Sequence, residues 1–196
     1  DPGIEVHPIE TVGEHATNSV FLTDVWVADD YVVGEINKGW KYICDALNYE
    51  RFTFYTIAPL EQKFKELTSL VNKLSKDGIP LSEIPEVRKK IIYLAADVEK
   101  AKVLQRKVLS IAVQDQVPQT EAAVFKLFST KLHQRLANTA MDILGREGLY
   151  RKEYDKSPAN GKWEWSYRST LVDTIGAGTT EIQKNTIAKK SLNLPI

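Results

Sequence analysis

A short run near the end of the sequence combines glycines with the expected start of a helix. It reads Gly-Ala-Gly-Thr-Thr-Glu-Ile-Gln over residues 176–183. Thr180 and Gln183 have the spacing of a capping box, so a helix is expected to begin there with its free N–H groups and positive dipole end facing the glycines. Glycines let a flat ring or a phosphate approach the backbone closely. The run fits either a ligand-binding turn or a well-capped helix, and the pattern alone favours the second.

A dinucleotide-binding fingerprint does not fit the same run. That interpretation takes residues 171–175 as a strand feeding a G-x-G-x-x-G turn, but the sixth position is Glu181. The tail that follows is also too short for the second strand of a βαβ unit.

Glu50 and Arg51 form the second candidate for chemistry, within a segment rich in aromatic and aliphatic residues. Apolar neighbours disfavour the charged form of a carboxylate, which makes the group a better proton acceptor. A solvated glutamate beside a solvated arginine is nevertheless the commoner outcome for such a pair. Glu50 is a candidate base that needs support from its context.

Other catalytic chemistries find little support. His7, His15 and His133 lack the spacing of metal ligands, so no metal site is expected. No G-x-S-x-G nucleophile elbow occurs, and Cys44 has no evident activating base. His133 is interpreted as a residue of a helix surface or of the core edge.

The composition is typical of a soluble globular protein. The chain has 196 residues, and 26 lysines and arginines balance 26 aspartates and glutamates, so no basic excess favours nucleic acid or an anionic membrane. No apolar run approaches the about 20 residues of a membrane-spanning helix. The single cysteine fits a reducing compartment, so a cytoplasmic location is expected. Because the chain opens at Asp1 without a methionine or a signal segment, we expect it to be a fragment.

Two regions of different periodicity must position the candidate residues. Up to about Gly34 apolar and polar residues alternate, which predicts two or three short strands of a larger, mostly absent sheet. Beyond Gly39 the apolar residues follow a helical period as far as Val71, and Pro59 is expected to kink or split this helix.

Further amphipathic helices are predicted over residues 85–118 and 120–145, and a last helix begins near Thr180. The stretch over residues 150–167 is looser. Trp163 and Trp165 within it are expected to plug the end of a bundle rather than stack on a ligand. These elements predict a mainly α protein, an antiparallel four-helix bundle preceded by a short β remnant.

Taken together, several segments resemble the carboxy-terminal half of acyl-CoA dehydrogenases. The matching motifs are P-G-I-E-V-H-P-I over residues 2–9, N-S-V-F-L-T-D-V-W-V over 18–27, V-G-E-I-N-K-G-W over 33–40, N-Y-E-R over 48–51, D-T-I-G-A-G-T-T-E-I-Q-K-N-T-I-A over 173–188 and L-N-L-P near the end. The resemblance spans nearly the whole chain. It implies that residues 1–34 end a middle β domain and that residues 35–196 form a C-terminal helical bundle domain.

The resemblance implies an FAD-containing flavoprotein, an oxidoreductase of fatty acid metabolism that introduces an α,β double bond into an acyl-CoA thioester. A carboxylate removes the α-proton while hydride leaves the β-carbon for the flavin N5. The family places this base at one of two positions. The first is occupied here by Ala177, which accepts no proton; the second is occupied by Glu50, followed by the arginine that family members commonly share. Glu50 is therefore the implied base, and Arg51 is implied to hold its carboxylate.

The same resemblance implies a cofactor site and partners. Thr179 and Glu181 match positions that touch FAD, and Gly178 matches the glycine beside the reactive centre. The implied partners are the acyl-CoA substrate, further subunits in a homo- or hetero-oligomer (dimer or tetramer), and an electron-transfer flavoprotein. The fragment alone is expected to be inactive.

Two departures from the family pattern indicate a divergent branch. The usual arginine-phenylalanine-glycine signature is replaced over residues 75–80, and the stretch that is commonly Q-x-x-G-G-x-G reads D-I-L-G-R-E-G over residues 142–148. Two alternatives stay open: a non-catalytic structural subunit of a heteromeric acyl-CoA dehydrogenase, and a flavin monooxygenase on the same fold.

Overall fold

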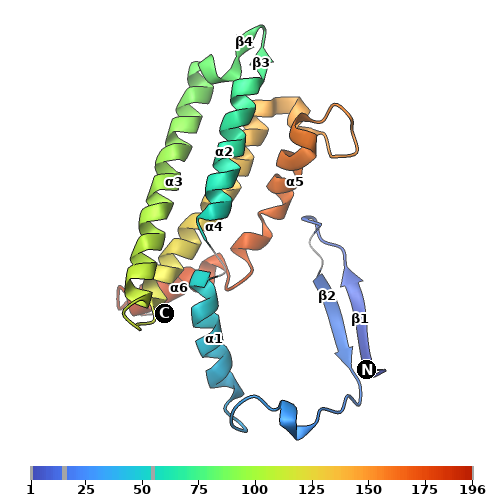
Figure 1. Cartoon of the computed structure of the whole chain (residues 1–196), viewed down its shortest axis with the longest axis vertical. Coiled ribbons are helices and arrows are strands. Elements are labelled where there is room, and N and C mark those ends of the chain that lie inside the picture. Colours follow the sequence, from blue (N-terminus) through green and yellow to red (C-terminus); the bar gives the residue numbers. More distant parts are fainter. Residues whose placement is uncertain (1, 15–16, 54–55, 196) are drawn as a thin grey trace.

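The computed structural model describes residues 2–14, 17–53 and 56–195; within 48–53 it describes the side chain of Glu50 alone. Its main elements are β1 (Ile4–Ile9), β2 (Thr17–Leu22), α1 (Gly39–Thr53), α2 (Ala58–Lys73), β3 (Ser75–Lys76), β4 (Ile79–Pro80), α3 (Pro85–Ala112), α4 (Gln119–Leu144), α5 (Lys162–Ser169) and α6 (Thr180–Lys190). Figure 1 shows α2, α3, α4 and α5 side by side as an up-and-down bundle, with α6 across one end. The predicted mainly α fold is confirmed.

The bundle is held together by a core to which each of its four helices contributes. The buried side chains include Leu60 and Leu67 of α2, Leu94 and Val98 of α3, Leu132 and Leu136 of α4, and Trp163 of α5. Their spacing of four or seven residues places each pair on one face of α2, α3 or α4. Because burying a side chain of this size contributes about 1.5–3 kcal/mol, the shared core accounts for the association of the helices.

α3 ends at Ala112, short of the predicted end at Pro118. The other helix boundaries follow local signals with one exception. Pro59 lies in the first turn of α2, where its missing N–H is tolerated, and it separates α2 from α1 as predicted. The exception is α5, which forms within the stretch predicted to be loose. It begins after Gly161, whose φ of +70° turns the chain and whose Cβ would lie 2.4 Å from the backbone nitrogen of Lys152. Trp163 is 1% exposed and fills the bundle core, as expected, whereas Trp165 is 42% exposed.

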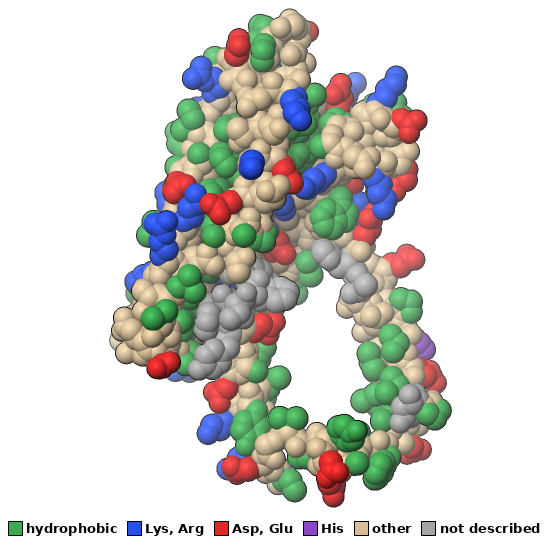
Figure 2. All heavy atoms as spheres, in the orientation of Figure 1, with side chains coloured by type: hydrophobic (Ala, Val, Ile, Leu, Met, Phe, Trp, Pro, Cys, Tyr) green, Lys and Arg blue, Asp and Glu red, His purple; other side chains and the backbone are tan. Residues whose placement is uncertain are grey.

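The β segment is a two-stranded hairpin that covers neither of its own faces. β1 pairs antiparallel with β2, with Ile4 opposite Leu22. Val6 and Phe21 are each more than half exposed. In Figure 2 apolar side chains run along the hairpin and the segment that connects it to α1, around an opening that lies between the hairpin and α1. Two of the two or three predicted strands are present, since Val25 lies outside the strands.

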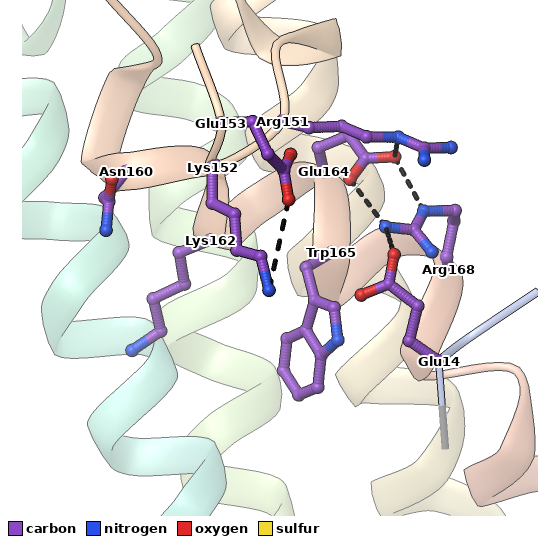
Figure 3. Close-up of a pocket in the computed structure, with 10 residues that line it drawn as sticks. Glu14, Arg151, Lys152, Glu153, Asn160, Lys162, Glu164, Trp165 and Arg168 are labelled. Atoms are coloured by element: carbon purple, nitrogen blue, oxygen red, sulfur yellow. Dashed lines mark hydrogen bonds and ion pairs between the residues drawn. The ribbon is translucent and has the colours of Figure 1, made fainter. Parts of the chain in front are cut away.

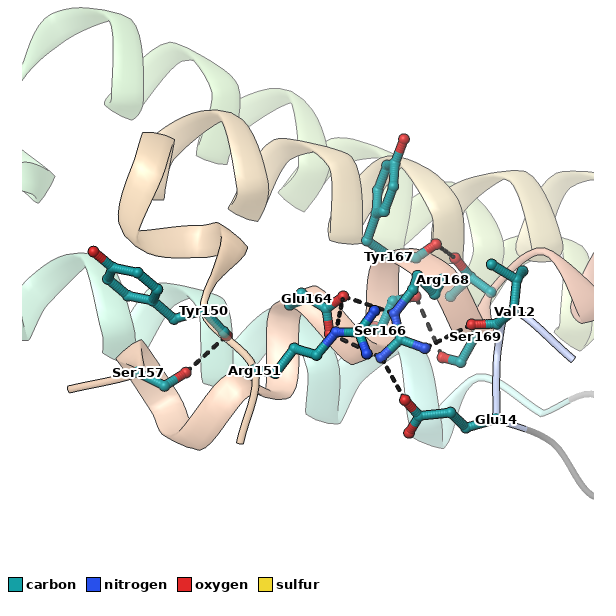
Figure 4. A network of polar contacts seen from close by, with 11 residues as sticks. Val12, Glu14, Tyr150, Arg151, Ser157, Glu164, Ser166, Tyr167, Arg168 and Ser169 are labelled. Carbon is teal, nitrogen blue, oxygen red and sulfur yellow. Dashed lines mark hydrogen bonds and ion pairs between the residues drawn. The ribbon is translucent and has the colours of Figure 1, made fainter. Parts of the chain in front are cut away.

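An arginine joins the end of the hairpin to the bundle (Figure 4). Arg168 of α5 donates to the carboxylate of Glu164 through Nε at 2.6 Å and Nη2 at 2.9 Å. Its Nη1 donates to the carbonyl oxygen of Val12 at 2.6 Å, and Nη2 lies 2.8 Å from a carboxylate oxygen of Glu14. Glu164 is 8% exposed, and the hydrogen bonds from Arg168 hold its pKa below the ordinary value against the opposing effect of burial.

We expect Glu164→Gln to lower the free energy of unfolding by about 1.5–3 kcal/mol at neutral pH, because it removes the carboxylate that accepts from Nε and Nη2 of Arg168 and leaves Glu14 as the remaining carboxylate partner. The pKa of Glu164 is lower in the folded than in the unfolded protein, so the carboxylate stabilises the fold fully above the unfolded pKa of about 4.3. This contribution is lost as the pH falls through the folded pKa. Urea unfolding of both proteins across this pH range measures the difference.

Glu153→Gln is the matched control, because the side chain of Glu153 is 68% exposed and lies 4.0 Å from Lys152. We expect no measurable change for it. A loss in Glu164→Gln that stays constant into the acid range would contradict the assigned role of the ion pair.

Candidate functional site

The turn before α6 has an unusual backbone. Ala177 and Gly178 have φ angles of +52° and +89°, both in the left-handed region. The helix begins at Thr180, as predicted, but the predicted capping box is wrong. Thr179 is the N-cap, and its hydroxyl accepts a hydrogen bond from the N–H of Ile182 at 3.3 Å. The extended backbone of Thr179 provides the geometry that a cap requires.

The side chain of Gln183 bonds to the turn itself and does not form a capping box. Its side chain is 0% exposed, and its Nε2 donates to the carbonyl oxygens of Ala177 at 3.1 Å and Gly178 at 3.2 Å. Lys126 approaches from α4, is 1% exposed, and donates from Nζ to the same Gly178 oxygen at 2.5 Å. Two buried side chains therefore hold the two carbonyl groups of this turn.

The anchored carbonyls determine where the amide groups of the turn point. The described peptide bonds are all trans, so the C=O and N–H of one peptide unit face opposite directions. The N–H groups of Gly178 and Thr179 consequently face away from Lys126 and Gln183. Together with the positive end of α6, they form a place suited to an electron-rich group.

Glu181 lies exposed in the first turn of α6. Its pKa is lowered mainly by a hydrogen bond with its own backbone N–H and then by one with the side chain of Thr179; Lys184 and Lys131 add to the effect. The carboxylate is therefore ionised at neutral pH. Three residues are expected to bind a cofactor. Two of them, Thr179 and Glu181, interact with each other through their side chains, and the third, Gly178, directly precedes Thr179.

Glu50 lies in α1 and is half-buried rather than open to solvent. Arg51 follows it in α1, but its side chain lies outside the described residues. Both α1 and α6 pack against α4, so this helix supports both parts of the expected site. That Glu50 and the Gly178 turn flank one bound thioester stays a prediction.

The two departures from the family pattern lie at the end of the bundle away from α6 (Figure 1). Residues 75–80 form a tight hairpin of β3 and β4, turned by Asp77 and Gly78 at positive φ. Asp142 near the end of α4 accepts a hydrogen bond from Lys90 of α3 at 3.0 Å. Asp142 and Arg146 line a surface depression of about 660 Å³.

Another depression, of about 310 Å³, lies between the end of the hairpin and α5 (Figure 3). Its cationic side chains are paired with carboxylates: Lys162 lies 2.5 Å from Glu66, and Lys152 lies 4.0 Å from Glu153. Arg168 is paired with Glu14 and Glu164. Because these cations already have carboxylate partners, the depression is not suited to an anionic ligand, and it is best described as part of the contact between hairpin and bundle.

Several other kinds of site find no support in the described part of the chain. No group of three histidine, cysteine or carboxylate residues is arranged to hold a metal ion there. None of the helices that the structure describes is both long and apolar enough to cross a bilayer. His133 of α4 lies half-buried with Nδ1 3.1 Å from a carboxylate oxygen of Asp173, which agrees with its interpretation as a residue of the core edge.

Lys126 is the residue of this site that sequence reasoning missed. A lysine on a long helix is normally solvated. The available signal was its setting among small residues, since Ala122, Ser129 and Thr130 share its side of α4 and are buried with it. Small residues at this spacing indicate close approach of another element.

The chain is thus a helical-bundle domain with a glycine-containing turn before its last helix. Comparison with known proteins identifies the family to which this domain belongs. The family model described as "Acyl-CoA dehydrogenase, C-terminal domain" matches residues 37–192. The chain therefore belongs to the acyl-CoA dehydrogenase family, and the resemblance found in the sequence is confirmed.

Individual relatives agree with this assignment. The acyl-CoA dehydrogenase FadE34 of Mycobacterium tuberculosis is 30% identical over 195 residues, which cover 99% of this chain and 25% of the relative. The ChsE4–ChsE5 complex from Mycobacterium tuberculosis has a TM-score of 0.88 at 27% identity, with 99% of this chain and 51% of that chain covered. The Tcur3481–Tcur3483 steroid ACAD gives 0.87 at 29% identity, with 98% and 49% covered. The chain spans about half or less of the length of the curated relatives it matches.

We expect Gly178→Ala to destabilise the protein more than Gly78→Ala. Both glycines have positive φ, so each substitution carries a backbone cost of about 1–2 kcal/mol. An added Cβ at Gly78 meets open space, whereas one at Gly178 lies 2.7 Å from Nε2 of Gln183. Displacing that buried amide breaks two hydrogen bonds, each contributing about 1 kcal/mol. Denaturant unfolding of the two variants measures the difference, and equal losses would contradict the role of Gln183 in the turn.

Proposed function

We propose that this chain is the carboxy-terminal part of an FAD-dependent acyl-CoA dehydrogenase that catalyses α,β-dehydrogenation of an acyl-CoA thioester. In this proposal residues 1–34 end a middle β domain and residues 35–196 form the C-terminal helical domain. The observation that carries the proposal is the family match over residues 37–192, combined with a half-buried Glu50 at the position where the family places its base.

Glu50 is the proposed base. Its carboxylate takes the proton from the α-carbon, and the electron pair of that C–H bond becomes the second bond between the α- and β-carbons. The β-hydrogen departs with its bonding pair as hydride. FAD, when bound, supplies the acceptor for this hydride. Arg51 is proposed to hold the Glu50 carboxylate.

The turn before α6 fits a flavin in two respects. The N–H groups of Gly178 and Thr179 face away from the buried anchors, and the positive end of α6 favours an electron-rich group. Gly178, Thr179 and Glu181 are the residues proposed to hold FAD. The departures over residues 75–80 and 142–148 imply that other contacts with FAD are made by different residues.

The assembly and electron transfer are part of the same proposal. Likeness to the ChsE4–ChsE5 complex and to the Tcur3481–Tcur3483 steroid ACAD supports an oligomer, homomeric or heteromeric, and an acyl-CoA substrate. We propose an electron-transfer flavoprotein as the electron acceptor and the cytoplasm as the location. The departures favour one second candidate, a structural subunit that pairs with a catalytic subunit and binds no FAD itself.

We expect Glu50→Gln to abolish bleaching of the flavin by acyl-CoA in the complete protein. Glutamine retains the shape of the side chain but accepts no proton, so flavin reduction should slow by about 10²–10⁴-fold. The measurement is visible absorbance of the purified protein under anaerobic conditions after mixing with acyl-CoA.

Asp45→Asn is the control, because Asp45 is an exposed carboxylate on the same helix. It should leave the reduction rate unchanged. Unchanged bleaching in Glu50→Gln would remove Glu50 from the mechanism. A wild-type protein without flavin would favour the structural subunit, and flavin that acyl-CoA does not bleach would favour a monooxygenase.

A further inference from the structure

Lys126 has a role in the structure that the proposed chemistry does not explain. It is 1% exposed, and its Nζ donates to the carbonyl oxygen of Gly178, 52 residues further along the chain. Burying an ammonium group costs several kcal/mol before its interactions offset the loss of water. An apolar side chain of the same length would fill this position on α4 without that cost.

Gln183 shows the same pattern beneath the same turn. Its Nε2 donates to the carbonyl oxygens of Ala177 and Gly178, while its buried Oε1 has no hydrogen-bond partner among the described residues. Leaving a buried acceptor without a partner destabilises the folded protein. Two side chains that are expensive to bury thus converge on the two carbonyl groups of one short turn, which indicates that they serve its orientation more than the stability of the fold.

The turn needs such anchors because its backbone is not determined by its own residues. Gly178 has no Cβ and adopts positive and negative φ with similar ease, so the peptide between Ala177 and Gly178 has two accessible orientations. In one of them its N–H faces outward; in the other its carbonyl oxygen does. An outward carbonyl would repel an electron-rich group at the positive end of α6.

We propose that Lys126 is a positioning residue for the dehydrogenation reaction: with Gln183 it holds the Ala177 and Gly178 carbonyls inward, so that the N–H groups of Gly178 and Thr179 face the bound flavin and thioester. The inference rests on the proposed function. Negative charge develops on the reacting pair as the α-proton and the hydride leave, and amide groups already oriented toward it stabilise this charge without reorganising. Lys126 acts on the rate through the backbone and touches no reacting atom.

The test compares Lys126→Met with Thr130→Val in the complete, FAD-containing enzyme. Methionine fills the same space without a donor. Thr130 is 2% exposed and lies one turn further along α4, and its hydroxyl donates to the Lys126 carbonyl within the same helix. Thr130→Val therefore removes a buried polar group from α4 without removing an anchor of the turn. Thermal unfolding, KM for acyl-CoA, kcat and anaerobic flavin reduction at saturating acyl-CoA are measured for each protein.

For Lys126→Met we expect an unfolding midpoint close to that of the wild type, because removal of a buried charge offsets the loss of its hydrogen bond. FAD content and KM should be unchanged, whereas flavin reduction should slow by at least about tenfold. The slowing should be smaller than that caused by removing a group that donates directly to the reacting atoms, which is about 10²–10³-fold. Thr130→Val should keep the wild-type reduction rate. Hydrogen exchange at residues 177–180 should be faster in Lys126→Met and unchanged in Thr130→Val.

An unchanged reduction rate in Lys126→Met would overturn the inference and leave the proposed function intact. An equal slowing in Thr130→Val, in step with lost stability, would also overturn it, since the effect would then be structural. If Lys126→Met does not fold, Lys126→Leu, which also lacks a donor, is judged by the same results. Failure of acyl-CoA to bleach the wild-type flavin would instead overturn the proposed function, and with it the role of Lys126 in the reaction.

Discussion

The packing of five helices against α4 is the constraint on which the rest of the structure depends. α1, α2, α3, α5 and α6 all contact this helix, so its surface is covered around much of its circumference. Ala123, Ala137 and Ala140 are completely buried and allow neighbouring backbones to approach closely. On the covered sides of this helix polar residues have no access to solvent, whereas Lys131, Arg135 and Asn138 lie exposed on the remaining side. Ser129 and Thr130 satisfy their hydroxyl groups on the Lys126 carbonyl of the same helix, and the Lys126 ammonium extends to the Gly178 turn.

The hairpin is attached to this bundle by a different kind of interaction. Its strands bury no side chain, and the link to α5 is the guanidinium of Arg168, which joins the backbone of Val12 to the carboxylates of Glu14 and Glu164. Directional hydrogen bonds thus locate the hairpin where apolar burial does not. Apolar side chains of the hairpin are exposed, and a contiguous apolar surface usually contacts another part of a protein. The relatives are at least about twice as long as this chain, so they have further segments that could cover the corresponding surface.

The proposed chemistry divides the site between two elements. The turn before α6 has Ala177 where some members of the family place a carboxylate, yet it keeps two residues in the left-handed region, a glycine and a hydroxyl cap. In our proposal the backbone of this turn orients the ligands and Glu50 on α1 supplies the base. The division requires both elements to be positioned relative to one support, and α4 meets this requirement because α1 and α6 both pack on it.

Local patterns in the sequence were sufficient for much of this description. Pro59 and Gly145 mark helix ends, the apolar periods define the long helices, and the motifs around Glu50 and Gly178 indicate the family, because periodicity and capping depend on residues close together in the chain. Only the tertiary structure revealed that Thr179 rather than Thr180 caps α6, that residues 162–169 form a helix, and that Lys126 is buried beneath the turn. In sequence a buried lysine is indistinguishable from a solvated one, since its environment is created by helices far from it along the chain.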